Sequence, residues 1–87
     1  MIVHLFAVLD SATGVYDGPV PALSDIAAMR NFGDMARNPE SAVGKHPSDF
    51  SLWNVGTWND ATGEIVCESK KCLAYAVDLI GPNDGEI

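Results

Sequence analysis

Cysteine is scarce in this chain of 87 residues, which contains only Cys67 and Cys72. Four residues stand between them, whereas redox sites and zinc knuckles use a Cys-x-x-Cys spacing. We interpret both as reduced side chains in packing or edge positions. The sequence therefore predicts no disulfide framework, no metal site and no cofactor.

Positive charge is also scarce, with 5 Lys and Arg against 12 Asp and Glu, a formal net charge of −7 and a pI near 4.3. A field of this sign repels phosphate backbones and anionic membranes, and it favours basic partners. The few cations are spread along the chain and outline no phosphate-binding groove. They are Arg30, Arg37, Lys45, Lys70 and Lys71.

Long apolar runs are absent, and the opening stretch MIVHLFAVLD has neither a basic leading region nor a cleavage site. We expect a protein of the cytoplasm with no membrane contact. The hydrophobic fraction of 47 % is typical of a folded chain. We predict one domain over residues 1–80 and a flexible tail over 81–87.

The apolar pattern predicts an α+β fold, an antiparallel sheet of about four to five strands with one amphipathic helix packed on one face, in the order β-β-α-β-β-β. The opening strand carries apolar residues at both parities, so both of its faces are expected to be covered. The remaining strands are expected in VYD, FSLWNVGTW, EIVCES and CLAYAVDLI, of which the last is also compatible with a helix because of its alanines.

A turn sequence occurs twice, as DSATG at residues 10–14 and NDATG at residues 59–63. Each copy offers a side-chain oxygen to the following amides and a glycine able to adopt positive φ, at Gly14 and Gly63. Both copies lie between apolar segments. We interpret the repeat as two hairpin turns, because neither copy has the alternating ligands of a calcium loop.

One amphipathic helix is predicted after Ser24, a suitable N-cap, and before Pro39. The two prolines of GPVPAL are expected to prevent strand pairing before the helix, and residues 39–49 to form a connecting loop. At 100° per residue the apolar residues gather on one side and the polar ones on the other. The apolar side comprises Ala22, Ile26, Ala28, Met29, Phe32, Met35 and Ala36, and the polar side Arg30, Asn31, Asp34 and Arg37.

Catalytic chemistry finds little support in the residues. His46 lies near Asp49 and could act as a general base, but a turn that caps the next element explains the same pair better. The serines lie in no nucleophile motif, and no glycine-rich phosphate loop is present. We predict that the protein is not an enzyme and has no catalytic residues.

The aromatic residues of FSLWNVGTW permit three interpretations. Phe50, Leu52 and Trp58 are expected on one face of the strand and Trp53 on the other. Core packing under the helix is favoured over a stacking platform for single-stranded DNA built on Trp53 and Trp58. A contact with another protein, or a homodimer that buries an open sheet face, is the third interpretation.

The stretches RNFGDMARN and KHPSDFSLWNVGTWNDATGEI, in this order, resemble the small nonstructural protein of gokushovirus-type microviruses, which are single-stranded DNA bacteriophages. The similarity spans about Val3 to Val66. Asn59 departs from the family pattern, which has Asp there, and nothing after Cys67 aligns. The matching positions are Arg30, Phe32, Asp34, His46, Pro47, Asp49, Leu52, Gly56, Trp58, Asn59, Thr62 and Gly63.

The resemblance implies a protein made in the infected bacterium, absent from the mature virion, and acting in viral DNA replication or in the switch to single-strand synthesis and packaging. Combined with the acidic charge, it favours a nonenzymatic accessory protein that contacts an unidentified replication or packaging protein of the virus or host. The alternative is a single-stranded DNA-binding protein. The contact surface is expected to include Arg30, Asp34, His46, Asp49, Trp53 and Trp58.

Overall fold

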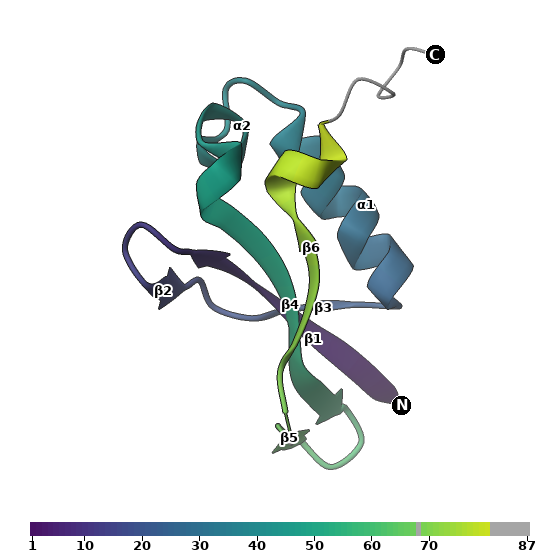
Figure 1. Ribbon diagram of the computed structural model, residues 1–87. Helices are drawn as coiled ribbons and strands as arrows, with labels where there is room; N and C mark the ends of the chain where they lie inside the picture. The colour runs from purple at the N-terminus through teal and green to yellow at the C-terminus, as the bar shows by residue number, and fades with distance from the viewer. Residues whose placement is uncertain (68, 81–87) are drawn as a thin grey trace.

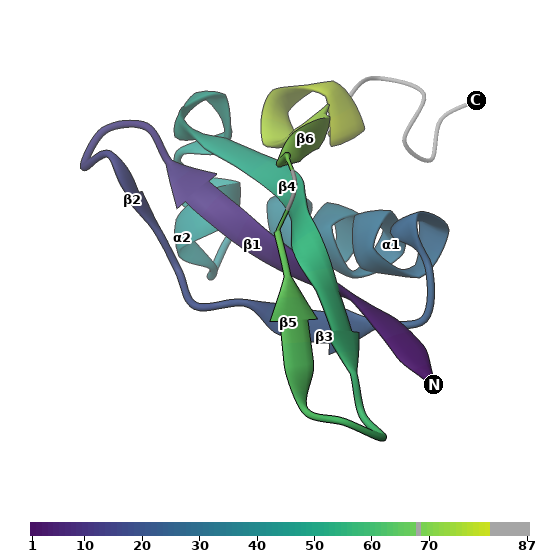
Figure 2. The same ribbon diagram turned by 90° about the horizontal axis from the view of Figure 1, so that it is seen from below.

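The structure is a computed structural model that describes residues 1–67 and 69–80. It is an α+β fold, as predicted: an open antiparallel sheet with one main helix, α1 (Asp25–Ala36), and a short helix, α2 (Ala42–Lys45), on the same side of the two long strands (Figures 1 and 2). The predicted tail, 81–87, lies outside the described residues. The sheet comprises β1 (Ile2–Asp10), β2 (Val15–Tyr16), β3 (Val20–Ala22), β4 (Phe50–Asn59), β5 (Glu64–Val66) and β6 (Lys71–Tyr75).

The two long strands β1 and β4 pair with each other at the centre of the sheet, and each carries two short strands on its outer edge. Strands β2 and β3 pair with β1, whereas β5 and β6 pair with β4. All these pairs are antiparallel. The sheet is therefore two hairpins joined along their long strands, and each hairpin has a return strand in two pieces.

The duplicated turn closes these two hairpins. Asp10 Oδ1 accepts from Ala12 N–H at 3.0 Å, and Asn59 Oδ1 accepts from Ala61 N–H at 2.9 Å. The two glycines follow with φ of 74° at Gly14 and 78° at Gly63, a region in which a Cβ is strained. The interpretation of the repeat as a pair of hairpin turns is confirmed.

Each turn also contacts the start of the other long strand. The Ser11 N–H donates to the carbonyl of Asp49, just before β4, at 2.8 Å. The equivalent residue of the second turn, Asp60, donates its N–H to the carbonyl of Met1, just before β1, at 3.1 Å. The two halves of the sheet are thus held together by the same contact at both ends.

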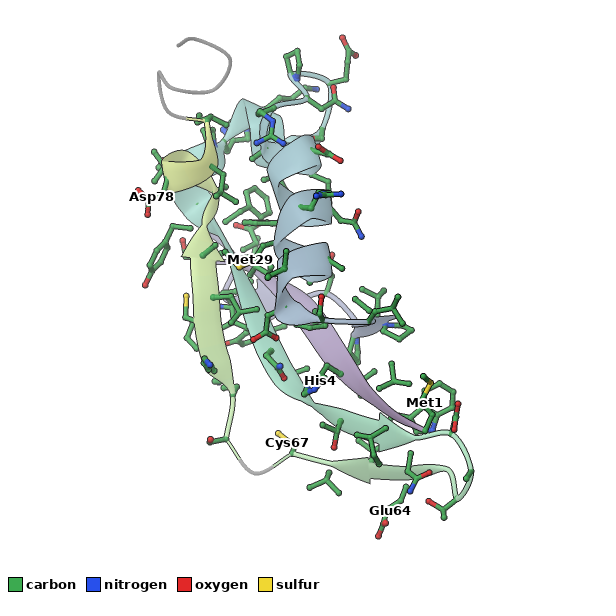
Figure 3. All side chains as sticks on the ribbon, turned by 90° about the vertical axis from the view of Figure 1, so that its right-hand side faces the viewer. Met1, His4, Met29, Glu64, Cys67 and Asp78 are labelled. Carbon is green, nitrogen blue, oxygen red and sulfur yellow. The ribbon has the colours of Figure 1, made fainter. Side chains whose placement is uncertain are left out.

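Helix α1 begins as predicted, because Ser24 Oγ accepts from Ala27 N–H at 3.1 Å. Its buried stripe has a spacing of four residues, at Ala28, Phe32 and Ala36. Figure 3 shows Met29 between α1 and the sheet. Phe6, Leu52, Val43 and Ala76 complete this core.

The predicted apolar side of the helix was too broad. Ile26 is 73 % exposed and Met35 is 39 % exposed, although both were assigned to the buried side. The sheet has only two long strands, so the helix buries a narrow stripe against it. Apolar residues beside that stripe remain in contact with solvent.

Two local predictions were wrong, and a third was right for only part of its length. Val20–Ala22 forms β3 although Pro19 precedes it and Pro21 lies within it, since an edge strand points alternate N–H groups away from its neighbour. The expected loop 39–49 contains α2, capped by Ser41 Oγ at 2.9 Å from Gly44 N, and a 3₁₀ helix, Pro47–Asp49. The last predicted strand is extended only as β6, after which Ala76–Leu79 forms a second 3₁₀ helix.

Candidate contact surfaces

The six residues predicted as a contact surface lie in three separate places. Arg30 and Asp34 are exposed on α1, His46 and Asp49 lie between α2 and β4, and the two tryptophans lie on β4. Asp34 Oδ1 accepts from Arg37 Nη2 at 3.0 Å, and the Asp49 carbonyl accepts from the first hairpin turn. The structure therefore does not assemble these residues into one site.

Trp53 and Trp58 share one face of the sheet, contrary to the prediction that they lie on opposite faces. Trp53 is paired with Ala7 and Trp58 with Val3, and these two residues of β1 point to the same side. The strand β4 contains one extra residue between Asn54 and Gly56, a β-bulge that reverses the alternation. Strict alternation of side chains, if counted through this bulge, places Trp58 on the wrong face relative to Trp53.

The face that carries the tryptophans is the one turned away from α1, since Phe6, Val8 and Leu52 point to the helix from the alternate positions. Leu5 and Ala7 are nevertheless buried, so the centre of β1 is covered on both faces, as predicted.

An aromatic and cationic cluster lies on this second face. The rings of Tyr16 and Trp53 meet edge to face with centroids 6.1 Å apart. Lys70 Nζ lies 4.8 Å from the centroid of Tyr16 and 5.8 Å from that of Trp53, distances typical of cation–π contacts. Trp53 Nε1 also donates to Ser51 Oγ at 2.9 Å.

Sequence reasoning missed Tyr16 as a member of this cluster. The signal that could have found it is the hairpin register, in which Tyr16 is paired with Leu9 and therefore lies on the same face as Ala7 and Trp53. Lys70 lies in the segment between β5 and β6, and no pattern in the sequence places it over the rings.

Tyr75 is exposed at the edge of the same face, paired with Ser51. A side-chain hydrogen bond with Cys72 raises the pKa of Tyr75 above its ordinary value of 10.0, and the nearby Asp78 charge acts in the same direction. Cys67 and Cys72 are both free thiols.

The β3–α1 groove is the hollow between the edge strand β3 and the helix, with a volume of about 220 Å³. Its floor consists of Phe6, Phe32 and Leu52, its walls of Val20, Pro21 and Met35. Asp17 and Asn31 are the polar side chains of the lining. It is therefore an apolar hollow with one carboxylate among its lining residues.

A polar hollow of about 310 Å³ lies between β4 and the segment that joins β5 to β6, and its lining includes His4, which Figure 3 labels. The Asn54 side-chain amide donates a hydrogen bond from Nδ2 to Asp25 Oδ1 at 3.1 Å. The same Nδ2 lies 3.3 Å from His4 Nδ1. Asn54 Oδ1 accepts from Gly56 N–H at 3.2 Å. These bonds tie the β-bulge of β4 to the first turn of the helix.

Neither metal ligands nor a membrane span appears within the described ranges. No three His, Cys, Asp or Glu side chains of residues 1–67 and 69–80 are grouped so as to hold a metal ion. In the same part of the chain, no helix has the length and apolar character needed to cross a bilayer.

Comparison with known proteins gives one finding. Neither the curated proteins nor the solved structures contain a match to this chain. The family model described as Phage ORF5 protein matches residues 3–79, which include every described strand and helix except the first residue of β1, Ile2. The chain therefore belongs to the Phage ORF5 protein family.

Proposed function

We propose that this phage protein is a nonenzymatic accessory protein of a gokushovirus-type microvirus, acting through protein contacts in viral DNA replication or in the switch to single-strand synthesis and packaging. It works in the cytoplasm of the infected bacterium and is absent from the mature virion. Its partner is a replication or packaging protein of the virus or host. Membership of a phage protein family and the resemblance in its helix and β4 support this proposal.

One observation carries the protein-contact part of the proposal. Large apolar side chains are exposed along β3 and on the side of α1 that faces it, namely Val20 at 60 %, Leu23 at 84 % and Met35 at 39 %. Apolar side chains that gather on the surface of a small soluble chain mark sites of protein contact. The net charge of −7 makes the same surface unsuited to a phosphate backbone.

The test is an infection with a phage whose copy of this gene is interrupted, complemented from a plasmid. We expect double-stranded replicative DNA to accumulate and single-stranded DNA to fall without the protein, and the wild-type plasmid to restore the ratio. Purified virions should lack the protein on an immunoblot that detects it in the infected cells. A normal DNA ratio in the interrupted phage would contradict the proposal.

The single-stranded DNA-binding function remains a second candidate because of the Tyr16, Trp53 and Lys70 cluster, to which Trp58 adds an exposed ring on the same face. Bases stack on aromatic side chains, and an adjacent lysine favours the phosphate. One observation argues against this second candidate, because Lys70 already lies over the two rings on which a base would stack.

A titration with a fluorescent single-stranded oligonucleotide separates the two candidates. The adaptor function predicts no binding at physiological salt. Binding that survives physiological salt in the wild type, and is lost in Trp53→Ala, would favour the DNA-binding function. Light scattering on the same sample tests self-association, since a homodimer is one way to bury an apolar sheet face.

A further inference from the structure

We propose that the β3–α1 groove binds a basic segment of the partner protein, which inserts one large apolar side chain between β3 and α1 and places lysines or arginines beside Asp17 and Asp34. This inference rests on the proposed function, since it names the partner chemistry for the protein contact. Each part of it follows from the lining of the groove and from the charges around it.

The groove has the size and lining for one apolar side chain. Its volume of about 220 Å³ exceeds the roughly 150 Å³ of an engineered apolar cavity that binds benzene. Phe6 and Phe32 on its floor are each only 1 % exposed, so the floor is fixed by the core. Val20 and Met35 on its walls are exposed and have apolar surface to lose on binding.

The charge beside the groove is negative at one end. Asp17 lies on the segment between β2 and β3, and one of its carboxylate oxygens, Oδ1, accepts from Val8 N–H at 3.1 Å. A carboxylate accepts several hydrogen bonds, so Asp17 can still accept one from a lysine or arginine side chain of the partner. Its bond to β1 holds the carboxylate at the rim.

Asp34 lies one helical turn after Asn31, a residue of the groove lining, and therefore on the outer flank of the groove. The helix returns alongside the segment that carries Asp17, because the chain reverses between β3 and α1 (Figure 2). The bond of Asp34 to Arg37 is exposed, and exposed ion pairs contribute little, so a partner cation can replace it.

The charge of the whole chain acts in the same direction. A net charge of −7 attracts a basic segment and raises its association rate at low salt. The same charge repels an acidic peptide. The expected ligand therefore combines a leucine- or phenylalanine-sized anchor with flanking positive charges.

The experiment uses the isotopically labelled full chain and three capped heptapeptides followed by amide chemical shifts. The first peptide has a central leucine flanked by glycines and two lysines at each end, the second replaces leucine by glycine, and the third replaces the lysines by glutamates. We expect the first to shift amides of Gly18, Asn31 and Met35, the second to bind about tenfold more weakly, and the third not to bind.

Two variants with the same change of charge give the matched control. Met35→Lys introduces a cation into the groove wall and should abolish binding of the first peptide. Ile26→Lys introduces it on the opposite side of α1, where the side chain is 73 % exposed, and should preserve binding. The amide spectra show whether each variant is folded, and Val20→Lys repeats the test from the strand side of the groove.

Three outcomes would each overturn the inference. They are equal binding by Met35→Lys and Ile26→Lys, chemical-shift changes confined to the face of Tyr16 and Trp53, and binding of the glutamate peptide. The complementation assay keeps this failure apart from failure of the proposed function. If the groove is not the contact site, plasmids encoding Met35→Lys still restore the ratio of single-stranded to double-stranded DNA that the interrupted phage loses.

Discussion

The backbone N–H of Ser11 donates to the carbonyl of Asp49 at 2.8 Å and so ties the first hairpin turn to the start of the other long strand. Asp60 forms the equivalent bond in the second turn. The duplicated turn sequence thus occupies equivalent places in two halves of one sheet, and the two copies are expected to respond alike to substitution.

Alanine at either turn glycine should destabilise the fold. Gly14 and Gly63 have positive φ, and a Cβ in that region costs about 1–2 kcal/mol. No atom lies within 4 Å of the Cβ that either would gain, so the cost is purely conformational. Urea denaturation of Gly14→Ala and Gly63→Ala measures it.

The matched control for these two variants is Gly18→Ala. Gly18 also has no atom within 4 Å of an added Cβ, but its φ lies outside the positive region. This variant should be neutral or more stable by up to about 1 kcal/mol. A loss of stability equal to that of the turn variants would show that φ is not the cause.

Gly56→Ala should be more harmful than the turn variants. Gly56 has φ of 154°, and an added Cβ would collide with the backbone carbonyl of Val66 on β5. Strain of about 1–3 kcal/mol is expected from the backbone alone, and displacement of β5 adds to it. Calorimetry of Gly56→Ala should show a lower melting temperature. Hydrogen exchange on the same variant should show faster amide exchange in β5. Gly63→Ala, in contrast, should leave amide exchange at Cys72 and Leu73 in β6 unchanged.

Removal of the N-cap of α1 should weaken the helix. Ser24→Ala deletes the acceptor of the Ala27 N–H, a change that costs about 1 kcal/mol. Ser24→Asp should restore most of the stability, since Asp is an equally good N-cap. The exposed Ser48 provides the control, because Ser48→Ala should fall within about 0.5 kcal/mol of wild type in the same denaturation assay.

Tyr75 should ionise above pH 10.0 in the folded protein, because its hydrogen bond with Cys72 raises its pKa. The folded state holds this proton more tightly than the unfolded state, so the contribution to stability is present below the unfolded pKa and is lost as pH rises through the folded pKa. Ultraviolet titration of tyrosinate in a Tyr16→Phe background isolates Tyr75. In Cys72→Ala the midpoint should move back toward 10.0, and an unchanged midpoint would contradict the assigned cause.

The sequence was sufficient to predict the fold class, the paired turns and the start of α1, because each depends on local chemistry. Side-chain oxygens of Asp10 and Asn59 cap the turns, and Ser24 caps the helix, whatever lies elsewhere in the chain. The number of strands was underestimated because β3 is stabilised by its pairing with β1 and has little strand character of its own.

The candidate surfaces were harder to predict because they depend on register. A single extra residue before Gly56 places Trp58 on the same face as Trp53, and no feature of the sequence shows where a bulge will form. The β3–α1 groove likewise depends on the unpredicted β3 and on the narrow stripe of α1 that the sheet covers. Local patterns specify elements, whereas sites arise from how elements meet.

The divided return strands have a consequence for the behaviour of the protein at high concentration. Both outer edges of the sheet are interrupted, between Tyr16 and Val20 on one side and between Val66 and Lys71 on the other, and Pro21 removes one donor from the first edge. An incoming strand from another molecule finds only short runs of ladder partners. The divided edges should therefore disfavour edge-to-edge pairing between molecules of this chain.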